Sequence, residues 1–208
     1  MSILDELDKR NLISPTSQKL RDLVKTHFHD LYSAPFTKPS EYVSQMYRRY
    51  LQLPSNWKSN SMNGSIFHLI VAVVLYRSGI HPLHQEASIT FVPHAIFDIV
   101  AFKNDGSIVC FSLKTSFRER WKQADLEARA LKMVHRTAKC LLISYEIDDA
   151  DNTQRKIASG GAIALDDAIS AVTDRFDNLL VSLQSTSFVQ PPTVPMMEKA
   201  QLSSLPSL

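Results

Sequence analysis

The sequence has few of the features that mark several classes of protein. Its 208 residues include only two cysteines, and 23 basic against 21 acidic residues leave a formal net charge of +2. Two cysteines cannot form a multi-bridge framework, so Cys110 and Cys140 are expected to be free thiols in the core strands of a cytoplasmic protein. A balanced charge excludes a histone-like polycation, and any nucleic-acid site must therefore come from local clustering.

Long apolar runs and internal repeats are also absent. The most apolar segment, residues 66–76, contains His68 and falls short of the roughly 20 residues that span a bilayer. Residues 1–6 are acidic and have no apolar core of the kind that signal peptides carry. We therefore expect no membrane role, and we expect the apolar segment to form a buried helix.

Three regions follow one another along the chain. Residues 1–60 contain four prolines and predict short helices, residues 61–185 predict an α/β core, and residues 186–208 are rich in proline and predict a disordered tail. The elements expected in the core are helix 65–78 with Gly79 as its end, strands 88–92, 97–102, 108–114, 141–145 and 162–165, a long helix 118–136 and a final helix from Asp166 to about Leu183. This order predicts a central mixed sheet flanked by helices.

Two of these strands form a hairpin around the turn at 104–106. The turn places Asp98 roughly opposite Ser112 and makes Lys114 its diagonal neighbour, on the same face of the sheet. The hairpin thus predicts that Asp98 and Lys114 meet at one edge of the sheet. Such a pair by itself is most often a surface ion pair.

The long helix contributes a carboxylate in an unusual position. A helical wheel of residues 121–139 places Glu127 inside an apolar arc that contains Ala124, Leu126, Ala130, Leu131, Met133, Val134 and Ala138. The opposite side carries Lys122, Asp125, Arg129, Lys132, Arg136 and Lys139, which we interpret as a solvated face more readily than as a phosphate-binding stripe. A carboxylate on an apolar face is costly unless it is paired, for example with Lys114, or binds a metal.

These three side chains suit hydrolysis of a phosphodiester. Such an enzyme places a divalent cation on the scissile phosphate and activates a water against it. Mg²⁺ prefers oxygen ligands, which Asp98 and Glu127 would supply. A lysine beside the metal can orient or deprotonate the water and offset the phosphate charge, and Lys114 is the candidate.

Asp98, the run Ser112-Leu113-Lys114 and Glu127 resemble the active site of the PD-(D/E)xK nucleases. They are most similar to the branch of restriction endonucleases that recognises CCGG and CCNGG-type sites, in which a serine replaces the acid before the lysine and a glutamate on the next helix takes over. The resemblance covers about residues 63–185. It implies a restriction-endonuclease-like fold and Mg²⁺-dependent cleavage of double-stranded DNA, with Mn²⁺ as a substitute and the carbonyl of Leu113 as a further metal ligand.

The same branch carries an arginine-acid-arginine motif shortly after the lysine, and Arg118-Glu119-Arg120 stands there. Arginine can pair bidentately with guanine, and a carboxylate can accept from cytosine N4. The resemblance therefore implies that this triplet, with Lys122 beside it, reads G·C pairs; a helix-capping charge cluster is the alternative. A short palindromic site would require a homodimer, for which residues 1–60 would supply DNA contacts or the dimer interface.

Two positions depart from the family pattern. Phe97 stands where a proline usually precedes the first aspartate, and His68 stands where the preceding helix usually carries a glutamate. Glu86 is another candidate for that carboxylate, but we expect it in a loop too far along the chain. A histidine there predicts weak Mg²⁺ binding and better support by Mn²⁺, with His68 itself as a possible ligand.

Two alternatives stay open. A repair or modification-dependent nuclease of the same superfamily would keep the chemistry and change the target. A non-catalytic DNA-binding module or assembly partner is a different class, and His68 and Ser112 favour it, since both replace acids of the family pattern.

Overall fold

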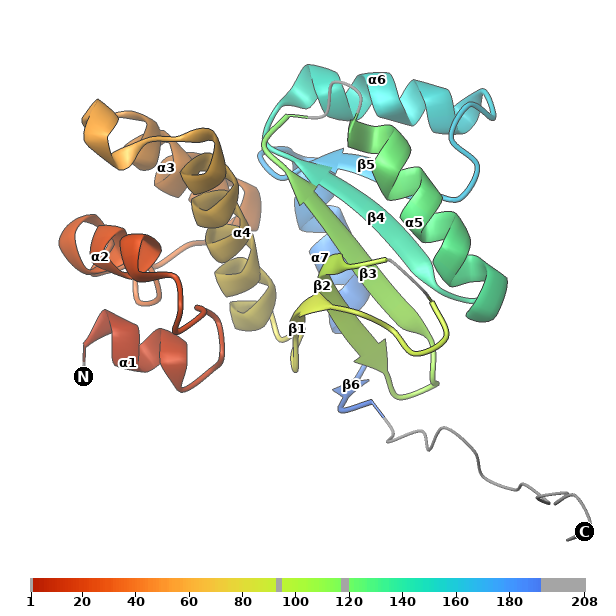
Figure 1. Ribbon diagram of the computed structural model, residues 1–208, viewed down its shortest axis with the longest axis horizontal. Coiled ribbons are helices and arrows are strands. Elements are labelled where there is room, and N and C mark those ends of the chain that lie inside the picture. Colours follow the sequence, from red (N-terminus) through yellow and green to blue (C-terminus); the bar gives the residue numbers. More distant parts are fainter. Residues whose placement is uncertain (1, 93–94, 117–119, 192–208) are drawn as a thin grey trace, which may run out of the picture.

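Helices cover both faces of a central sheet in the computed structural model, which describes residues 2–92, 95–116 and 120–191 (Figure 1). Helices α1 to α4 lie together on one side, α7 packs on the same face of the sheet as α4, and α5 and α6 cover the opposite face. Their bounds are α1 Ile3–Asp8, α2 Gln18–His27, α3 Pro39–Leu51, α4 Asn60–Arg77, α5 Arg120–Val134, α6 Ile147–Ala158 and α7 Asp174–Gln184, with a 3-10 helix at Ser55–Trp57. No helix of the described chain is long and apolar enough to cross a membrane.

The sheet of the described residues has six strands, with the order β1-β2-β3-β4-β5 and with β6 paired to β2. The strands are β1 His84–Ala87, β2 Phe97–Lys103, β3 Ile108–Lys114, β4 Lys139–Ser144, β5 Asp167–Ser170 and β6 Phe188–Val189. Strands β1, β2 and β3 pair antiparallel, as do β2 and β6, whereas β3, β4 and β5 pair parallel. The expected α/β architecture with a mixed sheet between helices is confirmed.

Alternation along β3 separates two apolar cores. Val109, Phe111 and Leu113 pack with α4 and α7, and the N-terminal helices extend this core. Cys110 faces the other core, beneath α5 and α6, where its register partner in β4 is Cys140. Both cysteines are free and buried, as expected. Successive side chains of a strand point to opposite faces, so Ser112 and Lys114 share the α5 side with Cys110.

Helix α4 is the central helix of the larger core. It is apolar around most of its circumference and buries ten side chains, as a helix enclosed on several sides does. It begins earlier than expected because Ser59 accepts a hydrogen bond from the backbone N of Met62 at 3.1 Å and caps it. Gly79, with φ of +83°, follows its end, as the sequence predicts.

Several predicted elements lie elsewhere. The first strand is at His84–Ala87 and not at 88–92, and the last parallel strand is at Asp167–Ser170 and not at 162–165. Helix α6 was not predicted, because most of its residues are polar and it buries only Ala150 and Thr153.

The C-terminal part of the chain also differs from expectation. Asp166 does not cap the last helix; its carboxylate accepts from the backbone N of Cys140 at 2.6 Å, and Thr173 precedes α7. Phe188 and Val189 lie in the segment expected to be disordered, yet they form β6 on the edge of β2. Residues 192–208 lie outside the described chain.

Candidate active site

Asp98 and Lys114 are in direct contact. The pairing of Ile99 with Phe111 puts Asp98 opposite Ser112, which is buried. Oδ2 of Asp98 accepts a hydrogen bond from the backbone N of Leu113 at 2.6 Å and from Nζ of Lys114 at 2.8 Å. Both side chains are partly buried, with Lys114 21% and Asp98 29% exposed. The hairpin therefore brings the two charges together at the edge that the sequence predicts.

This contact lies where parallel strands end. Lys114 is the last residue of β3 and pairs with Ser144, the last residue of β4. Ligands of open α/β sheets bind outside the carboxyl ends of parallel strands, because the loops and helix starts that follow these ends meet there. Helix α5 begins at Arg120, shortly after Lys114, and Arg120 is exposed at its start. Lys114 and Asp98 are both partly exposed at this edge.

Not all of the predicted base-reading residues can be placed. Arg118 and Glu119 lie outside the described residues. Lys122 is exposed on α5, with its Nζ 5.8 Å from the centre of the Trp121 ring. Lys156 of α6 approaches the same ring to 4.4 Å, so two cations lie beside the first turn of α5.

Glu127 lies within electrostatic reach of the Asp98–Lys114 pair. Burial raises the pKa of Glu127, and the charge of Asp98 adds to this, while a hydrogen bond from Gln123 and the charge of Lys114 oppose it. Nε2 of Gln123 donates to Oε1 of Glu127 at 2.8 Å. Within the described chain Glu127 forms no ion pair, so the alternative of a buried salt bridge with Lys114 is not present.

The predicted orientation of α5 was wrong in part: Ala124, Leu131 and Ala138 are buried as expected, but other members of the predicted arc are exposed. The helix buries Trp121, Ala124, Asp125, Ala128 and Leu131, whereas Leu126 and Met133, which were expected on the buried arc, are 61% and 79% exposed. Glu127 is partly buried at the border of the buried face. Ala124 and Ala128 allow the helix to lie close to the sheet, whereas Leu126 and Met133 remain outside.

Asp125, expected on the solvated side, is the buried carboxylate of α5. It is 5% exposed, and its Oδ1 accepts from the backbone N of Ala164 at 2.8 Å and of Leu165 at 3.1 Å. Arg129 lies 3.6 Å away and compensates its charge. Asp125 therefore holds the segment that leads from α6 to β5. The sequence of the helix alone does not indicate that Asp125, and not Glu127, is the more deeply buried carboxylate.

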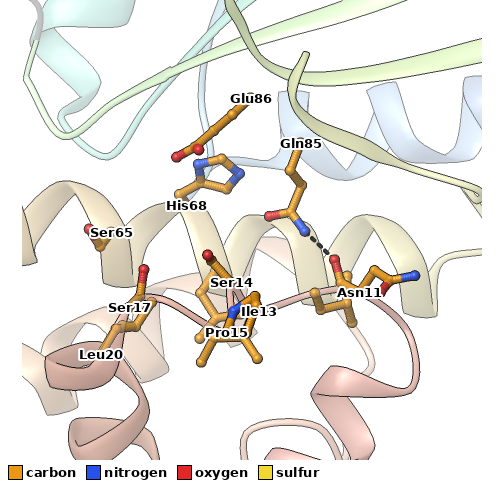
Figure 2. Close-up of a pocket in the computed structure, with 12 residues that line it drawn as sticks. Asn11, Ile13, Ser14, Pro15, Ser17, Leu20, Ser65, His68, Gln85 and Glu86 are labelled. Carbon is orange, nitrogen blue, oxygen red and sulfur yellow. Dashed lines mark hydrogen bonds between the residues drawn. The ribbon is translucent and has the colours of Figure 1, made fainter.

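His68 lies on the opposite side of the same sheet edge. It lines a pocket of about 280 Å³ together with Ser65, Gln85, Glu86 and residues of the 11–17 segment (Figure 2). Burial lowers the pKa of His68, whereas the charges of Asp98 and Glu86 raise it and that of Lys114 lowers it. The imidazole therefore lies close enough to the catalytic candidates to be influenced by all three charges.

Glu86 is in a strand and not in the expected loop. The pairings of His84 with Val100 and of Ala87 with Phe97 place Glu86 opposite Asp98 in the register of β1 and β2. The sequence pattern predicts the first strand at 88–92, four residues later than β1, and Glu86 was therefore expected in a loop. The cis peptide bond before Pro82, at the approach to β1, is a local feature that the sequence pattern does not disclose.

The donors around this edge suit a hard divalent cation, although they do not form a closed site. No three His, Cys, Asp or Glu side chains of the described residues converge so as to hold a metal ion. Two carboxylates, Asp98 and Glu127, nevertheless lie near enough for one to raise the pKa of the other, and a cation would relieve this repulsion. Carboxylate oxygens are the donors that Mg²⁺ and Mn²⁺ prefer.

This architecture, a mixed sheet with its polar edge at the ends of β3 and β4, is the restriction-endonuclease-like fold. The structure of the restriction endonuclease PspGI in complex with its substrate DNA is similar over 90% of this chain and 88% of that chain, with a TM-score of 0.57 and 14% sequence identity. No protein-family model and no curated protein matches the sequence.

Proposed function

We propose that the protein is a type II restriction endonuclease. It hydrolyses phosphodiester bonds of double-stranded DNA at a short palindromic site that contains G·C pairs, with Mg²⁺ as its cofactor. The observation that carries this proposal is the contact of Lys114 with Asp98, at 2.8 Å, on the polar sheet edge of a restriction-endonuclease-like fold. An ion pair that only stabilises the surface would not be expected to lie at this edge and beside a half-buried carboxylate such as Glu127.

The chemistry divides among four residues. Asp98, Glu127 and the carbonyl of Leu113 would hold the cation, which supplies Lewis acidity at the scissile phosphate when it is bound. Asp98 also holds Lys114, whose Nζ would orient the attacking water and offset the phosphate charge. Ser112 is buried and has no carboxylate, so the second carboxylate would come from α5.

Base recognition would use the residues that follow Lys114 in the chain. Arg118, Glu119 and Arg120 follow the catalytic lysine closely in the chain, so a protein that cuts beside the bases it reads can use them together with Lys122. A palindromic site is read by two copies related by a two-fold axis, and the protein would act as a homodimer.

A second candidate function is a DNA-binding module without catalysis. The specific observation in its favour is that α4 offers His68, and not a carboxylate, to the sheet edge. A nuclease of the same superfamily that acts in repair or on modified DNA would keep the site and change the target.

Incubation of the purified protein with a plasmid of known sequence and Mg²⁺ tests these candidates. We expect discrete fragments with 5′-phosphate ends, and we expect none with Lys114→Ala. A smear would indicate a nuclease without a defined site. Retention of the plasmid by a gel shift without any nicking would support the non-catalytic module.

A further inference from the structure

A cavity of about 410 Å³ lies at the end of the sheet opposite to Lys114, where β1, β6 and the turn between β2 and β3 meet (Figure 1). Its wall is mostly apolar and includes Phe91, Phe102, Ile108 and Val189. Ile108 begins β3, and the strand extends for about 20 Å from there to Lys114. The cavity is therefore separate from the candidate active site.

The charged and imidazole side chains in the wall of this cavity favour an anion. Lys103, His84 and His135 line it, whereas no aspartate or glutamate of the described residues does. Hydrogen bonds from Ser107 lower the pKa of Asp105 in the adjacent turn, and the charge of Lys103 adds to this effect. Lys103 itself forms no ion pair in the described part of the chain. The wall thus presents positive charge that no neighbouring carboxylate neutralises by direct contact.

The two histidines indicate a ligand independently of this charge. The Nε2 atoms of His84 and His135 are both buried and have no hydrogen-bond partner among the residues that the structure describes. The ring of His84 packs edge-on against the ring of Phe102, with 5.7 Å between the centroids, and burial lowers its pKa. A buried polar atom without a partner costs free energy, and a ligand that accepts a hydrogen bond from it removes this cost. A neutral imidazole can donate from Nε2.

An aromatic side chain of the cavity wall is held in an unfavourable backbone conformation. The φ of Phe91 is +66°, which bulky residues rarely adopt, and its side chain is 62% exposed. The turn that holds it is closed by a hydrogen bond from the backbone N of Val92 to the backbone O of Ile89, at 3.0 Å. Backbone strain of this kind is concentrated at sites that bind ligands. An apolar ligand in the cavity gains contact with this exposed ring.

We propose that this cavity binds a small apolar molecule that carries a carboxylate at one end. The apolar body lies against Phe91, Phe102 and Ile108, and the carboxylate accepts hydrogen bonds from Lys103 and the two imidazoles. The volume falls within the range of about 300–1,000 Å³ that is usual for sites of small molecules, and such sites combine an apolar wall with a few polar groups. This binding site is additional to the proposed nuclease function and does not depend on it.

Calorimetric titration of the full chain without DNA tests the proposal. The probes are 1-naphthoate, an aromatic carboxylate, and 1-naphthamide, an uncharged molecule of nearly the same shape. We expect 1-naphthoate to bind and 1-naphthamide to bind about tenfold more weakly, because hydrogen bonds to a charged group are lost. Decanoate in a parallel titration distinguishes an aliphatic from an aromatic body. Failure of both carboxylates to bind, or equal binding of the amide, overturns the proposal.

Two pairs of variants locate the binding site. Lys103→Met should weaken the binding of 1-naphthoate about tenfold, whereas Lys19→Met, at an exposed lysine of α2, should not change it. Ala87→Leu fills the cavity from β1 and should abolish binding, whereas Ala130→Leu, on α5 and outside the cavity, should retain it. Thermal melting checks that each variant folds, and if Ala87→Leu does not fold, Lys103→Met decides.

Nuclear magnetic resonance of the imidazole nitrogens supplies a readout that loss of stability does not imitate. Addition of 1-naphthoate to the wild type should shift the Nε2 signals of His84 and His135, and the signal of the exposed His29 should stay in place. Unchanged signals of both cavity histidines, or wild-type affinity of folded Lys103→Met, overturns the assignment of the carboxylate to this cavity.

Discussion

Lys114 and Asp98 form an ion pair, and Lys132 and Asp166 form a second pair that is similar to it in length and burial. The Nζ–Oδ2 distance is 2.8 Å with exposures of 21% and 29%, and Lys132 and Asp166 are 2.7 Å apart with exposures of 24% and 35%. The two pairs are therefore similar in length and burial, and only the first lies at the polar edge of the sheet. A comparison of the two lysines separates catalysis from stability.

Replacement of Lys114 by alanine should reduce the rate of cleavage by about 100- to 10,000-fold, since a positioned proton-handling group contributes this much. Lys132→Ala should retain cleavage. Both variants should lose a similar free energy of unfolding, about 0.5–1 kcal/mol, because each removes a partly solvated pair. Single-turnover rates and denaturant titrations measure the two effects, and Mg²⁺-dependent cleavage by Lys114→Ala at the wild-type rate would contradict the assignment.

The partly buried carboxyl group of Glu127 should make the stability of the fold depend on pH. Burial raises its pKa in the folded state, so ionisation of Glu127 opposes folding at pH values above that pKa, whereas below its unfolded value near 4.5 the carboxyl is protonated in both states and has no effect. Glu127→Gln should therefore melt at a higher temperature than the wild type at pH 7.5, and at the same temperature at pH 4. Cleavage should be lost at both. A lower melting temperature of the variant at pH 7.5 would show that the carboxylate stabilises the fold.

Asp125, in contrast to Glu127, is expected to stabilise the fold and to have no part in cleavage. Its buried carboxylate accepts two backbone hydrogen bonds and faces Arg129, so Asp125→Ala should cost about 3 kcal/mol. Asp151→Ala, at an exposed position of α6, should change the free energy of unfolding by less than about 0.5 kcal/mol. Urea denaturation measures both. Folded Asp125→Ala should still cleave, and a loss of cleavage at a temperature where it is fully folded would place Asp125 in the site.

Replacement of Arg120 should impair the recognition of one base pair. If its guanidinium pairs with a guanine, Arg120→Lys keeps the charge and should still cost about 1–3 kcal/mol at that base pair alone. Arg136→Ala, beyond the other end of α5, should leave the preference for each base unchanged. Gel shifts with single base-pair substitutions in the site measure the effect. An equal loss on every DNA would instead indicate that Arg120 contacts a phosphate.

Local sequence determined the hairpin that carries Asp98 and Lys114. The turn around Gly106, with φ of +83°, sets the register of two strands that are adjacent in the chain, and this register alone places Asp98 beside Lys114. The boundary of α4 at Gly79 was likewise predictable, because a residue with positive φ ends a helix by its own conformation. In both cases the interactions connect residues close in sequence.

Only the tertiary structure decided which carboxylates lie near this hairpin. The sequence pattern of α5 permits more than one rotation, and packing of its alanines against the sheet buries Asp125 and leaves Glu127 at the border. The position of Glu86 depends on the pairing of β1 with β2 across the connection at 88–96, where the local sequence pattern predicts a strand instead. Helix rotation and the start of an edge strand are set by contacts between elements, and a single sequence does not contain these contacts as a local signal.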